Sequence, residues 1–343
     1  MEIIEKLKIN ENSKNVVSVV CCCDENFLPI TSVFLESLLE KSSQETFYDV
    51  ILLTDNVKQS SKNLIKFQAE KFQHSLLRII EVSNDLINNI NPNFGKAAYL
   101  RLLIPSLLKD YERAIYLDVD TIILSDLNEI FSKEFIANGK EIYCYAVDNL
   151  DRFFLEDPID NYKNYQTRGQ YFRKHVELNE NSIQKTFNSG VMLLNLKKMR
   201  EDKIVDKSIL LSQKKEFFAA DQHILYNVFN GEISYLERKW NVFGSVSNLI
   251  DTKIPQNIIE NWEQQDSQPA IIHYADRPKP WDDSGIKFEE YFWYYARKTP
   301  FYEKLKDNLE KKIEIKIQQE LKFLKKKTKF KYKIKQLIRR IND

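Results

Sequence analysis

The sequence predicts an α/β protein in which strands of a parallel sheet alternate with helices. Apolar runs of strand length recur along the chain, stretches with a helical spacing of apolar residues separate them, and acidic or polar residues follow several of the runs. The 343 residues suit one large α/β domain with an appendage, or two modest domains. Ligands bind beyond the carboxyl ends of strands in such sheets, so the residues that follow each run are the candidates for a site.

The first third of the chain has a strand–helix–strand pattern. Residues 15–23 (NVVSVVCCC) form a Val-rich apolar run that ends at Asp24, and residues 28–39 carry apolar side chains at helical spacing. The alternation continues with a strand at 48–53, a helix at 60–72 and a strand at 76–82. This order predicts a parallel sheet with helices on both faces.

Further elements are expected after residue 96. They are a helix at 97–108, a strand at 113–117, a strand at 190–196, a helix at 221–229 and a strand at 270–274. The segment 151–181 is polar and aromatic and has no clear period, which is typical of a functional or mobile loop.

Charge is distributed unevenly along the chain. The 51 basic and 50 acidic residues give a formal net charge of +1, which offers no argument for a nucleic-acid partner. Residues 321–340, however, are rich in Lys and Arg and contain no acid. Ile313, Ile317, Leu321 and Leu324 fall on one helical face before Phe330, Tyr332 and Ile334 alternate with Lys. This pattern predicts a basic amphipathic helix at a membrane surface, with a solvated helix packed on its own domain as the alternative.

Cysteine usage and the N-terminus favour a cytosolic protein. Cys21, Cys22 and Cys23 lie in the apolar run of the first strand, where neighbours face opposite sides of the sheet and match neither a disulfide nor a zinc pattern. We expect them to be core residues in a reducing compartment. The N-terminus has no long apolar core, and no stretch reaches the ~20 apolar residues of a membrane span, so we expect no signal peptide.

Two acids close the strand predicted at 113–117. With only seven glycines and no Gly-rich phosphate loop, the chain needs another positive charge to bind phosphates, and a metal supplies one. Asp118 and Asp120 would repel each other at the end of an apolar strand unless a cation joined them. Hard oxygen ligands suit Mg²⁺ or Mn²⁺ bridging a diphosphate. The alternative is that this short D-x-D pattern is a surface turn.

A histidine and a lysine extend the candidate site. His273 lies in the strand predicted at 270–274, and an imidazole added to two carboxylates favours Mn²⁺ over Mg²⁺. Lys279 follows it closely and would neutralise diphosphate oxygens as a leaving group departs. The alternatives are a structural histidine and a surface lysine.

Several segments together carry a family resemblance. They are CCDENF, YLRLLIP, AIYLDVDTIIL, FNSGVMLLNL, DQHILY and IHYADRPKPW. In this order, from about residue 16 to residue 281, the chain resembles the family-8 retaining glycosyltransferases, which include bacterial lipooligosaccharide galactosyltransferases and the glycogenins. The resemblance implies a GT-A type nucleotide-binding fold, with a Rossmann-like mixed sheet flanked by helices, and the use of Mn²⁺ and a UDP-sugar.

The resemblance also implies roles at the donor end. Asp24 and Asn26 match the residues that hold uracil and ribose, and Phe27 matches an aromatic ring that stacks on uracil. Arg101 matches an arginine that contacts the donor sugar. Lys279 matches the lysine at the diphosphate.

The reacting end is implied in the same way. Asp118, Val119 and Asp120 match the metal-binding D-x-D at the donor, and His273 matches the third metal ligand. Around the sugar ring the resemblance places Asn188, Asp221 and Gln222, with Asp148 on the sugar or acceptor side. Without the resemblance, helix and turn capping is the preferred explanation of Asn188, Asp221 and Gln222.

The family's retention of anomeric configuration implies a mechanism. Gln222 is the residue nearest the anomeric carbon by analogy, but an amide is a poor nucleophile. We therefore expect an oxocarbenium-like transition state in which a phosphate oxygen of the departing UDP helps to deprotonate the acceptor. One departure from the family pattern is Asp276, which stands where a glycine is usual. Its carboxylate would repel the diphosphate unless Arg277 compensates.

The sequence thus favours a transferase that moves galactose or glucose from a UDP-hexose to a lipopolysaccharide, a lipooligosaccharide or a related surface glycan or glycolipid. It would have a catalytic domain over 1–283 and an aromatic, basic region over 284–343 that holds it on the cytoplasmic face of the inner membrane. The segment 151–181 would be an acceptor-facing insertion or lid. Two alternatives remain open: a protein-acceptor transferase, self-glucosylating or adhesin-modifying, and a catalytically silent UDP-sugar-binding protein.

Overall fold

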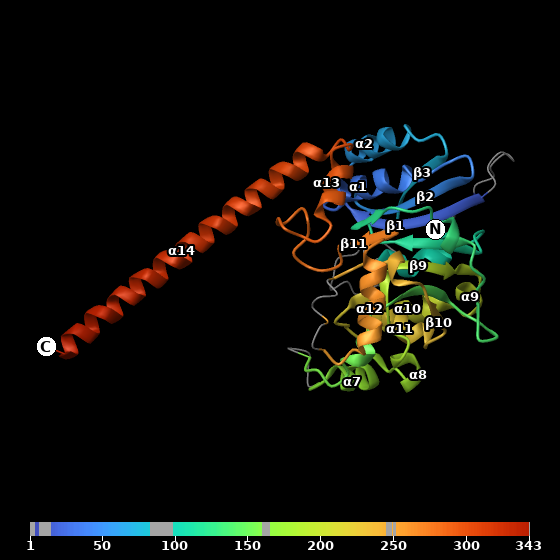
Figure 1. Cartoon of the computed structure of the whole chain (residues 1–343). Helices are drawn as coiled ribbons and strands as arrows, with labels where there is room; N and C mark the ends of the chain where they lie inside the picture. The colour runs from blue at the N-terminus through green and yellow to red at the C-terminus, as the bar shows by residue number, and fades with distance from the viewer. Residues whose placement is uncertain are drawn as a thin grey trace.

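A computed structural model describes residues 4–6, 15–82, 99–159, 165–244, 249 and 252–342, with side chains of the last helix described up to residue 327. Within these residues a seven-stranded sheet has the order β10-β8-β9-β4-β1-β2-β3 (Figure 1). Its strands are β1 (Asn15–Asp24), β2 (Thr46–Asp55), β3 (Ser75–Glu81), β4 (Arg113–Leu117), β8 (Cys144–Asp148), β9 (Phe187–Asn195) and β10 (Ile233–Tyr235). Two small pairs accompany it: β5 (Thr121–Ile123) with β11 (Ile271–His273), and β6 (Ile136–Ala137) with β7 (Lys140–Glu141).

Helices cover the sheet and connect its strands. They are α1 (Leu28–Leu39), α2 (Gln59–Ala69), α5 (Ile104–Leu107), α6 (Asn128–Phe131), α7 (Arg168–Tyr171), α8 (Glu180–Ile183), α9 (Leu196–Glu201), α10 (Ile204–Lys214), α11 (Ala220–Phe229), α12 (Gln256–Asp266), α13 (Glu289–Ala296) and α14 (Tyr302–Asn342). Short 3₁₀ turns are η1 (Leu100–Leu103), η2 (Asp151–Phe153) and η4 (Arg238–Trp240), and η3 (Phe172–Val176) is a π-helical turn.

The first half of the sheet confirms the predicted alternation. β1 pairs in parallel with β2 along its whole length, β2 pairs in parallel with β3, and β4 adds in parallel on the other side of β1. The predicted helix at 28–39 is α1. The parallel direction puts the ends of β1 and β4 at one edge, so Asp24 and the Asp118–Asp120 turn follow strands that finish on the same side of the sheet.

The second half of the sheet departs from a parallel arrangement. β9 runs antiparallel to both β4 and β8, while β10 pairs in parallel with β8. The sheet is therefore mixed, as the family resemblance implied. The strand predicted at 270–274 also exists, but it pairs with β5 and bridges Val242 instead of joining the main sheet. An apolar run does not encode the direction or the partner of its strand.

Two predicted segments differ from the observed secondary structure. The helix predicted at 97–108 is a 3₁₀ turn, η1, that continues as α5, with residues 97 and 98 outside the described residues. The segment 151–181 contains η2, α7, η3 and part of α8 instead of one irregular loop, and its residues 160–164 are likewise not described.

The core confirms the interpretation of the cysteines. One apolar cluster on one face of the sheet includes Val20 and Cys22, and a second on the other face includes Cys21 and Cys23, as strand alternation requires. All four cysteines, Cys144 included, are buried and free.

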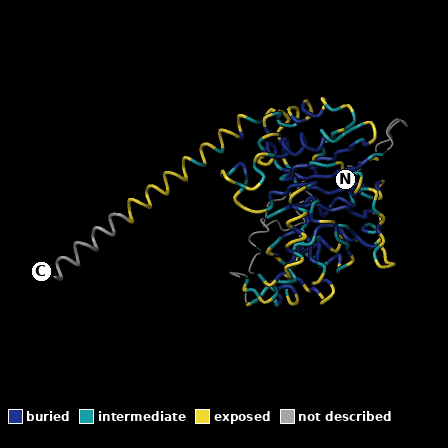
Figure 2. Tube along the Cα trace, in the orientation of Figure 1, coloured by how far each residue is buried: buried dark blue, intermediate teal, exposed yellow. Residues whose placement is uncertain are grey.

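The C-terminal region begins on the body and then leaves it. Phe292 and Tyr295 of α13 and Phe301 and Leu305 near the start of α14 are buried in the same apolar cluster as α1. Beyond this α14 projects away from the body, and most of its side chains described up to residue 327 are exposed, although Lys312 and Lys316 form ion pairs with Asp282 and Asp283 (Figures 1 and 2). The described residues contain no helix that is both long and apolar enough to span a membrane.

Candidate metal and donor site

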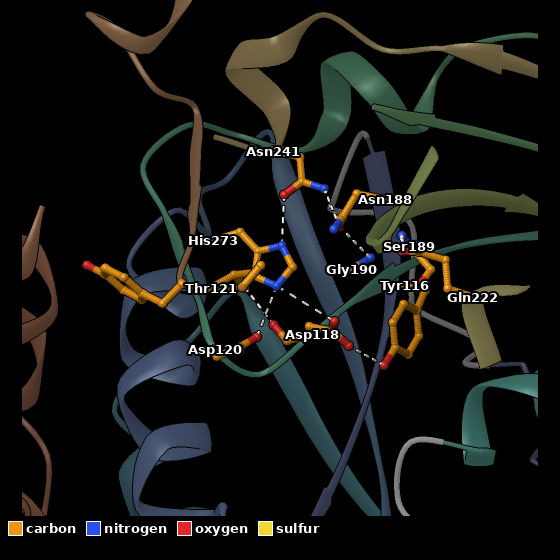
Figure 3. A network of polar contacts seen from close by, with 12 residues as sticks. Tyr116, Asp118, Asp120, Thr121, Asn188, Ser189, Gly190, Gln222, Asn241 and His273 are labelled. Carbon is orange, nitrogen blue, oxygen red and sulfur yellow. Dashed lines mark hydrogen bonds and ion pairs between the residues drawn. The ribbon is translucent and has the colours of Figure 1, made fainter. Parts of the chain in front are cut away.

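Two acids and a histidine meet beyond the carboxyl end of β4. Asp118 and Asp120 lie in the turn between β4 and β5, and the register of β11 with β5 places His273 opposite Thr121. His273 Nε2 lies 3.2 Å from Asp120 Oδ1 and 3.7 Å from Asp118 Oδ2. One ligand atom from each residue lies within 4.8 Å of the others (Figure 3). We call these three residues the Asp–Asp–His cluster.

Hydrogen bonds determine which nitrogen of His273 faces the acids. The backbone N–H of Gly190 donates to Asn188 Oδ1 at 2.9 Å, so that atom is an acceptor. Asn241 Nδ2 donates to the same oxygen at 2.9 Å, which turns Asn241 Oδ1 toward His273 Nδ1, also at 2.9 Å (Figure 3). Nδ1 must therefore carry a proton, and Nε2 is the ring nitrogen that faces the two carboxylates.

A glycine makes room for the histidine. Gly190 lies on β9 beside the cluster, and its carbonyl accepts from Asp118 N–H at 2.8 Å. A Cβ at position 190 would lie 2.2 Å from His273 Cε1 and 2.8 Å from Asp118 Oδ2. A larger residue would push the imidazole away from the acids, so the close approach depends on glycine.

The donor set fits a divalent cation. Two carboxylate oxygens and a neutral imidazole nitrogen are ligands that Mn²⁺ accepts, and Mg²⁺ accepts the oxygens. Burial opposes ionisation of Asp120, but His273 and Lys279 outweigh it and hold the pKa of that carboxyl well below its usual range. The cluster is thus convergent and negatively charged at Asp120, and it could hold a cation.

Arg101 joins the cluster to α11. Its guanidinium is buried and donates to Asp118 Oδ1 at 2.7 Å, while its Nε lies 3.0 Å from Asp221 Oδ2. It also donates to the carbonyl and hydroxyl of Ser189, each at 3.1 Å, and lies over the ring of Tyr116. Burial, followed by the charge of Asp118, raises the pKa of Asp221 to about 6 in spite of Arg101. Arg101 therefore orients one carboxylate of the cluster and binds another beside it.

Lys279 also lies at the cluster. Its ammonium is 2.9 Å from Asp120 Oδ2 and donates to the carbonyls of Tyr274 and Ala275, the latter at 3.0 Å. These contacts hold the loop that carries Lys279 against the turn that carries Asp118 and Asp120. The structure brings this sequence-predicted cation together with Asp118, Asp120 and His273.

The residues expected at the uridine end lie at the end of β1. Asp24 Oδ1 accepts from the backbone N–H groups of Asn26, at 2.9 Å, and Phe27, at 3.0 Å, which shapes the turn into α1. The Phe27 ring is 42% exposed at this turn. Among the described residues, no hydrogen bond or ion pair links this group to the cluster. Both lie at the same edge of the sheet, because β1 and β4 run in parallel.

Asn188 and Gln222 form a second polar layer beside the cluster. Gln222 Oε1 accepts from Ser189 N–H at 3.0 Å, and its Nε2 donates to Tyr226 Oη at 3.0 Å. Asn188 links Gly190 to Asn241, as described above. Both amides are oriented by hydrogen bonds, and both line a cavity of about 510 Å³ on the side of α7 and α11.

Two predicted residues point elsewhere. Asp148 ends β8, accepts from Leu150 N–H at 2.8 Å and forms an ion pair with Arg152, and burial raises its pKa. It does not contact the cluster. Val119 is buried in the core, so only its backbone can face a donor.

Sequence reasoning missed residues that support the cluster. Asn241 follows η4 in a segment with no periodic pattern, and nothing in a single sequence marks it. Gly190 was detectable in principle, because a glycine inside a strand often marks a close approach, and this chain has only seven glycines.

The mixed sheet flanked by helices is the GT-A fold of glycosyltransferases. The family model described as Glycosyl transferase family 8 matches residues 18–285, and the chain belongs to this family. The resemblance inferred from its motifs is thereby confirmed.

Curated relatives and solved structures agree with this assignment. General stress protein A of Bacillus subtilis is 25% identical over 294 residues, 82% of this chain and 93% of that protein. A lipopolysaccharide 1,2-glucosyltransferase of Escherichia coli K12 is 23% identical over 282 residues, 81% of this chain and 76% of that protein.

Two solved structures show the same fold. The bifunctional glycosyltransferase WbbM superposes with a TM-score of 0.75 at 21% identity, over 88% of this chain and 53% of WbbM. The galactosyltransferase LgtC, solved with donor and acceptor sugar analogues, gives 0.65 at 18% identity, over 83% of this chain and 96% of LgtC. This chain thus spans about half of WbbM and nearly all of LgtC.

Proposed function

We propose that the chain is a retaining hexosyltransferase that moves galactose or glucose from a UDP-sugar to a lipopolysaccharide, a lipooligosaccharide or a related surface glycan. The observation that carries the proposal is the orientation of His273, whose Nε2 faces Asp118 and Asp120. The names of two similar proteins, a lipopolysaccharide glucosyltransferase and a galactosyltransferase, support this class of donor and acceptor.

The Asp–Asp–His cluster would hold Mn²⁺, with Mg²⁺ as a weaker substitute. When bound, the cation would supply positive charge that stabilises the departing UDP. Arg101 keeps Asp118 oriented, and Asn241 keeps the imidazole in its ligand form. Lys279 supplies a second positive charge for the diphosphate, from its present contact with Asp120.

At the other end of the donor, Asp24 and Asn26 would hold uridine, with Phe27 stacking on the base. The exposed ring of Phe27 supports the stacking role. One carboxylate oxygen of Asp24 accepts both hydrogen bonds of the turn, so the other oxygen would accept from a ligand.

The reacting sugar would lie between the cluster and the second polar layer. Gln222, Asn188 and Asp221 would surround the ring, with Gln222 nearest the anomeric carbon. The oxygen and the nitrogen of the Gln222 amide each already form a hydrogen bond within the protein. The amide would therefore orient the sugar and not attack it. Retention would then come from departure and attack on one face, with alignment and leaving-group stabilisation as the enzyme's main contributions. Asp148 would contact the sugar or the acceptor only after its ion pair with Arg152 breaks.

We also propose that the C-terminal region attaches the catalytic domain to the cytoplasmic face of the inner membrane. Residues 1–283 would form the catalytic domain and 284–343 the attachment region, docked on α1 through α13. Ile317, Leu321 and Leu324 of α14 are each more than half exposed among lysines, which supports a membrane-surface helix.

The decisive experiment measures UDP release from a panel of UDP-sugars with Mn²⁺, Mg²⁺ or chelator, and UDP binding under the same conditions. We expect one donor to be turned over with Mn²⁺ and activity to vanish in Asp120→Ala. Asp126→Ala, which changes an aspartate bonded to Thr46 and Tyr48 away from the cluster, is the matched control. Absence of Mn²⁺-dependent UDP binding in the folded wild type would refute the proposal.

A further inference from the structure

The cavity beside Gln222 and Asn188 combines carbohydrate-binding groups with a negative charge. Its lining includes the amide of Asn149, the amides of Asn188 and Gln222, and the ring of Phe218. Phe218 is 56% exposed, although a ring of this size is normally buried. An exposed ring offers an apolar surface to the C–H face of a sugar, while amides and carboxylates bond its hydroxyls.

The cation in this cavity is already neutralised. Arg168 forms an ion pair with Asp151, and both line the wall. His223 is neutral there, because burial, reinforced by the charge of Arg168, lowers its pKa to about 3. Among the described residues that line the cavity, Asp276 therefore carries the uncompensated charge, and that charge is negative.

Asp276 stands between two cavities of different charge. It also lines a second cavity of about 340 Å³, shared with His273, where Arg277 supplies positive charge and Lys287 is paired with Asp266. Neither Arg277 nor Arg238, a buried guanidinium that interacts with the charge of Asp276, lines the larger cavity, so both compensate Asp276 from outside its wall. Gly244, with φ of +64°, leaves space for the carboxylate, since a Cβ there would lie 2.8 Å from Asp276 Oδ2.

We propose that the larger cavity binds the terminal sugar of an uncharged acceptor, and that Asp276 is a specificity residue that rejects acceptor sugars bearing a carboxylate or a phosphate. This inference rests on the proposed transferase function. An anionic sugar would meet the Asp276 carboxylate while the guanidinium of Arg168 is held by Asp151. Neutral hydroxyls can bond both groups without that repulsion.

The test measures acceptor binding directly, so that it does not depend on turnover. Dissociation constants of neutral galactose- and glucose-terminated disaccharide glycosides are determined by NMR titration of the protein saturated with UDP and Mn²⁺. Each is compared with its analogue in which C6 of the terminal sugar is a carboxylate. Asp276→Asn removes the charge at constant size, and Glu263→Gln removes one exposed charge from α12, outside both cavities.

We expect at least one neutral glycoside to bind the wild type about tenfold more tightly than its carboxylate analogue, on the scale of one partly screened like-charge contact. Asn at 276 should reduce that ratio to about twofold at most, and Glu263→Gln should leave it unchanged. Equal binding of both analogues by the wild type, an unchanged ratio in Asp276→Asn, or no binding of any neutral glycoside would each overturn the inference. Failure of the proposed function would appear separately, as loss of Mn²⁺-dependent UDP binding.

Discussion

Asn241 fixes the tautomer of His273 through a 2.9 Å hydrogen bond between its Oδ1 and the imidazole Nδ1. The amide is fully buried, and its own orientation is set by Asn188, which in turn is set by the backbone N–H of Gly190. A main-chain donor on β9 thus determines which histidine nitrogen faces the acids. The orientation of the His273 imidazole is therefore set by the backbone of the sheet.

Replacing Asn241 should weaken metal binding. In Asn241→Leu the imidazole loses its acceptor, and we expect Mn²⁺ affinity to fall about 10- to 100-fold, the usual effect of removing such a partner of a ligating histidine. Asn241→Asp keeps an acceptor for Nδ1–H and should lose much less. Isothermal titration with Mn²⁺ measures both, with circular dichroism to verify folding. Equal affinities in the two variants would contradict this role.

Enlarging Gly190 should damage the cluster directly. The added methyl of Gly190→Ala would lie 2.2 Å from His273 Cε1, so the imidazole or β9 must move. We expect Mn²⁺ affinity to drop at least about tenfold, the range seen when a ligand's support is lost. Gly139→Ala is the control: its Cβ meets nothing within 4 Å, and its φ of +72° makes it strained by about 1 kcal/mol without touching the site. A Gly190→Ala protein with wild-type Mn²⁺ affinity would refute the claim.

The strand-end acids were predictable because their signal is local. An apolar run that ends at Asp118 and Asp120 predicts a positively charged partner whatever the rest of the fold. The periodicity of β1, α1 and β2 is likewise visible in their own residues. The partner of each strand is a property of the whole chain. The antiparallel direction of β9 and the isolated pairing of β11 with β5 could not be derived from their own residues.

The supporting residues of the site were less predictable still. Asn241 acts through contacts with β9 and β11, two segments distant in sequence, and its own neighbours carry no motif. Asp148 shows the converse: the family resemblance placed it on the sugar or acceptor side, but Arg152, four residues on, forms an ion pair with its side chain. A nearby partner of opposite charge is a signal that the sequence did contain.

Acid should destabilise the fold through His223. Ala219 N–H donates to His223 Nδ1 at 3.3 Å, and the Tyr171 hydroxyl, which itself accepts from Phe218 N–H, donates to it at 3.0 Å. Protonation of Nδ1 would break both bonds. Burial lowers the pKa of His223 to about 3, so the unfolded chain, with a histidine pKa near 6.5, binds the proton more readily.

Stability from His223 is therefore complete above about pH 6.5 and is lost as the pH falls toward 3. Between pH 7 and pH 5 the free energy of unfolding should fall by about 2 kcal/mol from this residue alone. Urea denaturation of the wild type and of His223→Gln at both values measures the difference. If the variant loses as much stability as the wild type between the two values, the histidine is not responsible.

The basic part of α14 should bind anionic membranes through its charge. Lys312 and Lys316 are paired with Asp282 and Asp283 on the body, whereas Lys322, Lys325, Lys326 and Lys327 lie farther along the exposed rod. Each lysine near a negative surface contributes about 1 kcal/mol, so changing these four to Gln should weaken binding to phosphatidylglycerol vesicles by about 10³-fold or to baseline.

Vesicle co-sedimentation at two salt concentrations measures this effect. Changing Lys58, Lys62, Lys66 and Lys71, on or beside α2, to Gln removes the same charge from the body and should change binding little. Binding that survives in the α14 variant and is insensitive to salt would show that charge on the rod does not hold the protein at the surface. Loss in both variants would instead assign attachment to the net charge of the whole chain, which is only +1 before the substitutions.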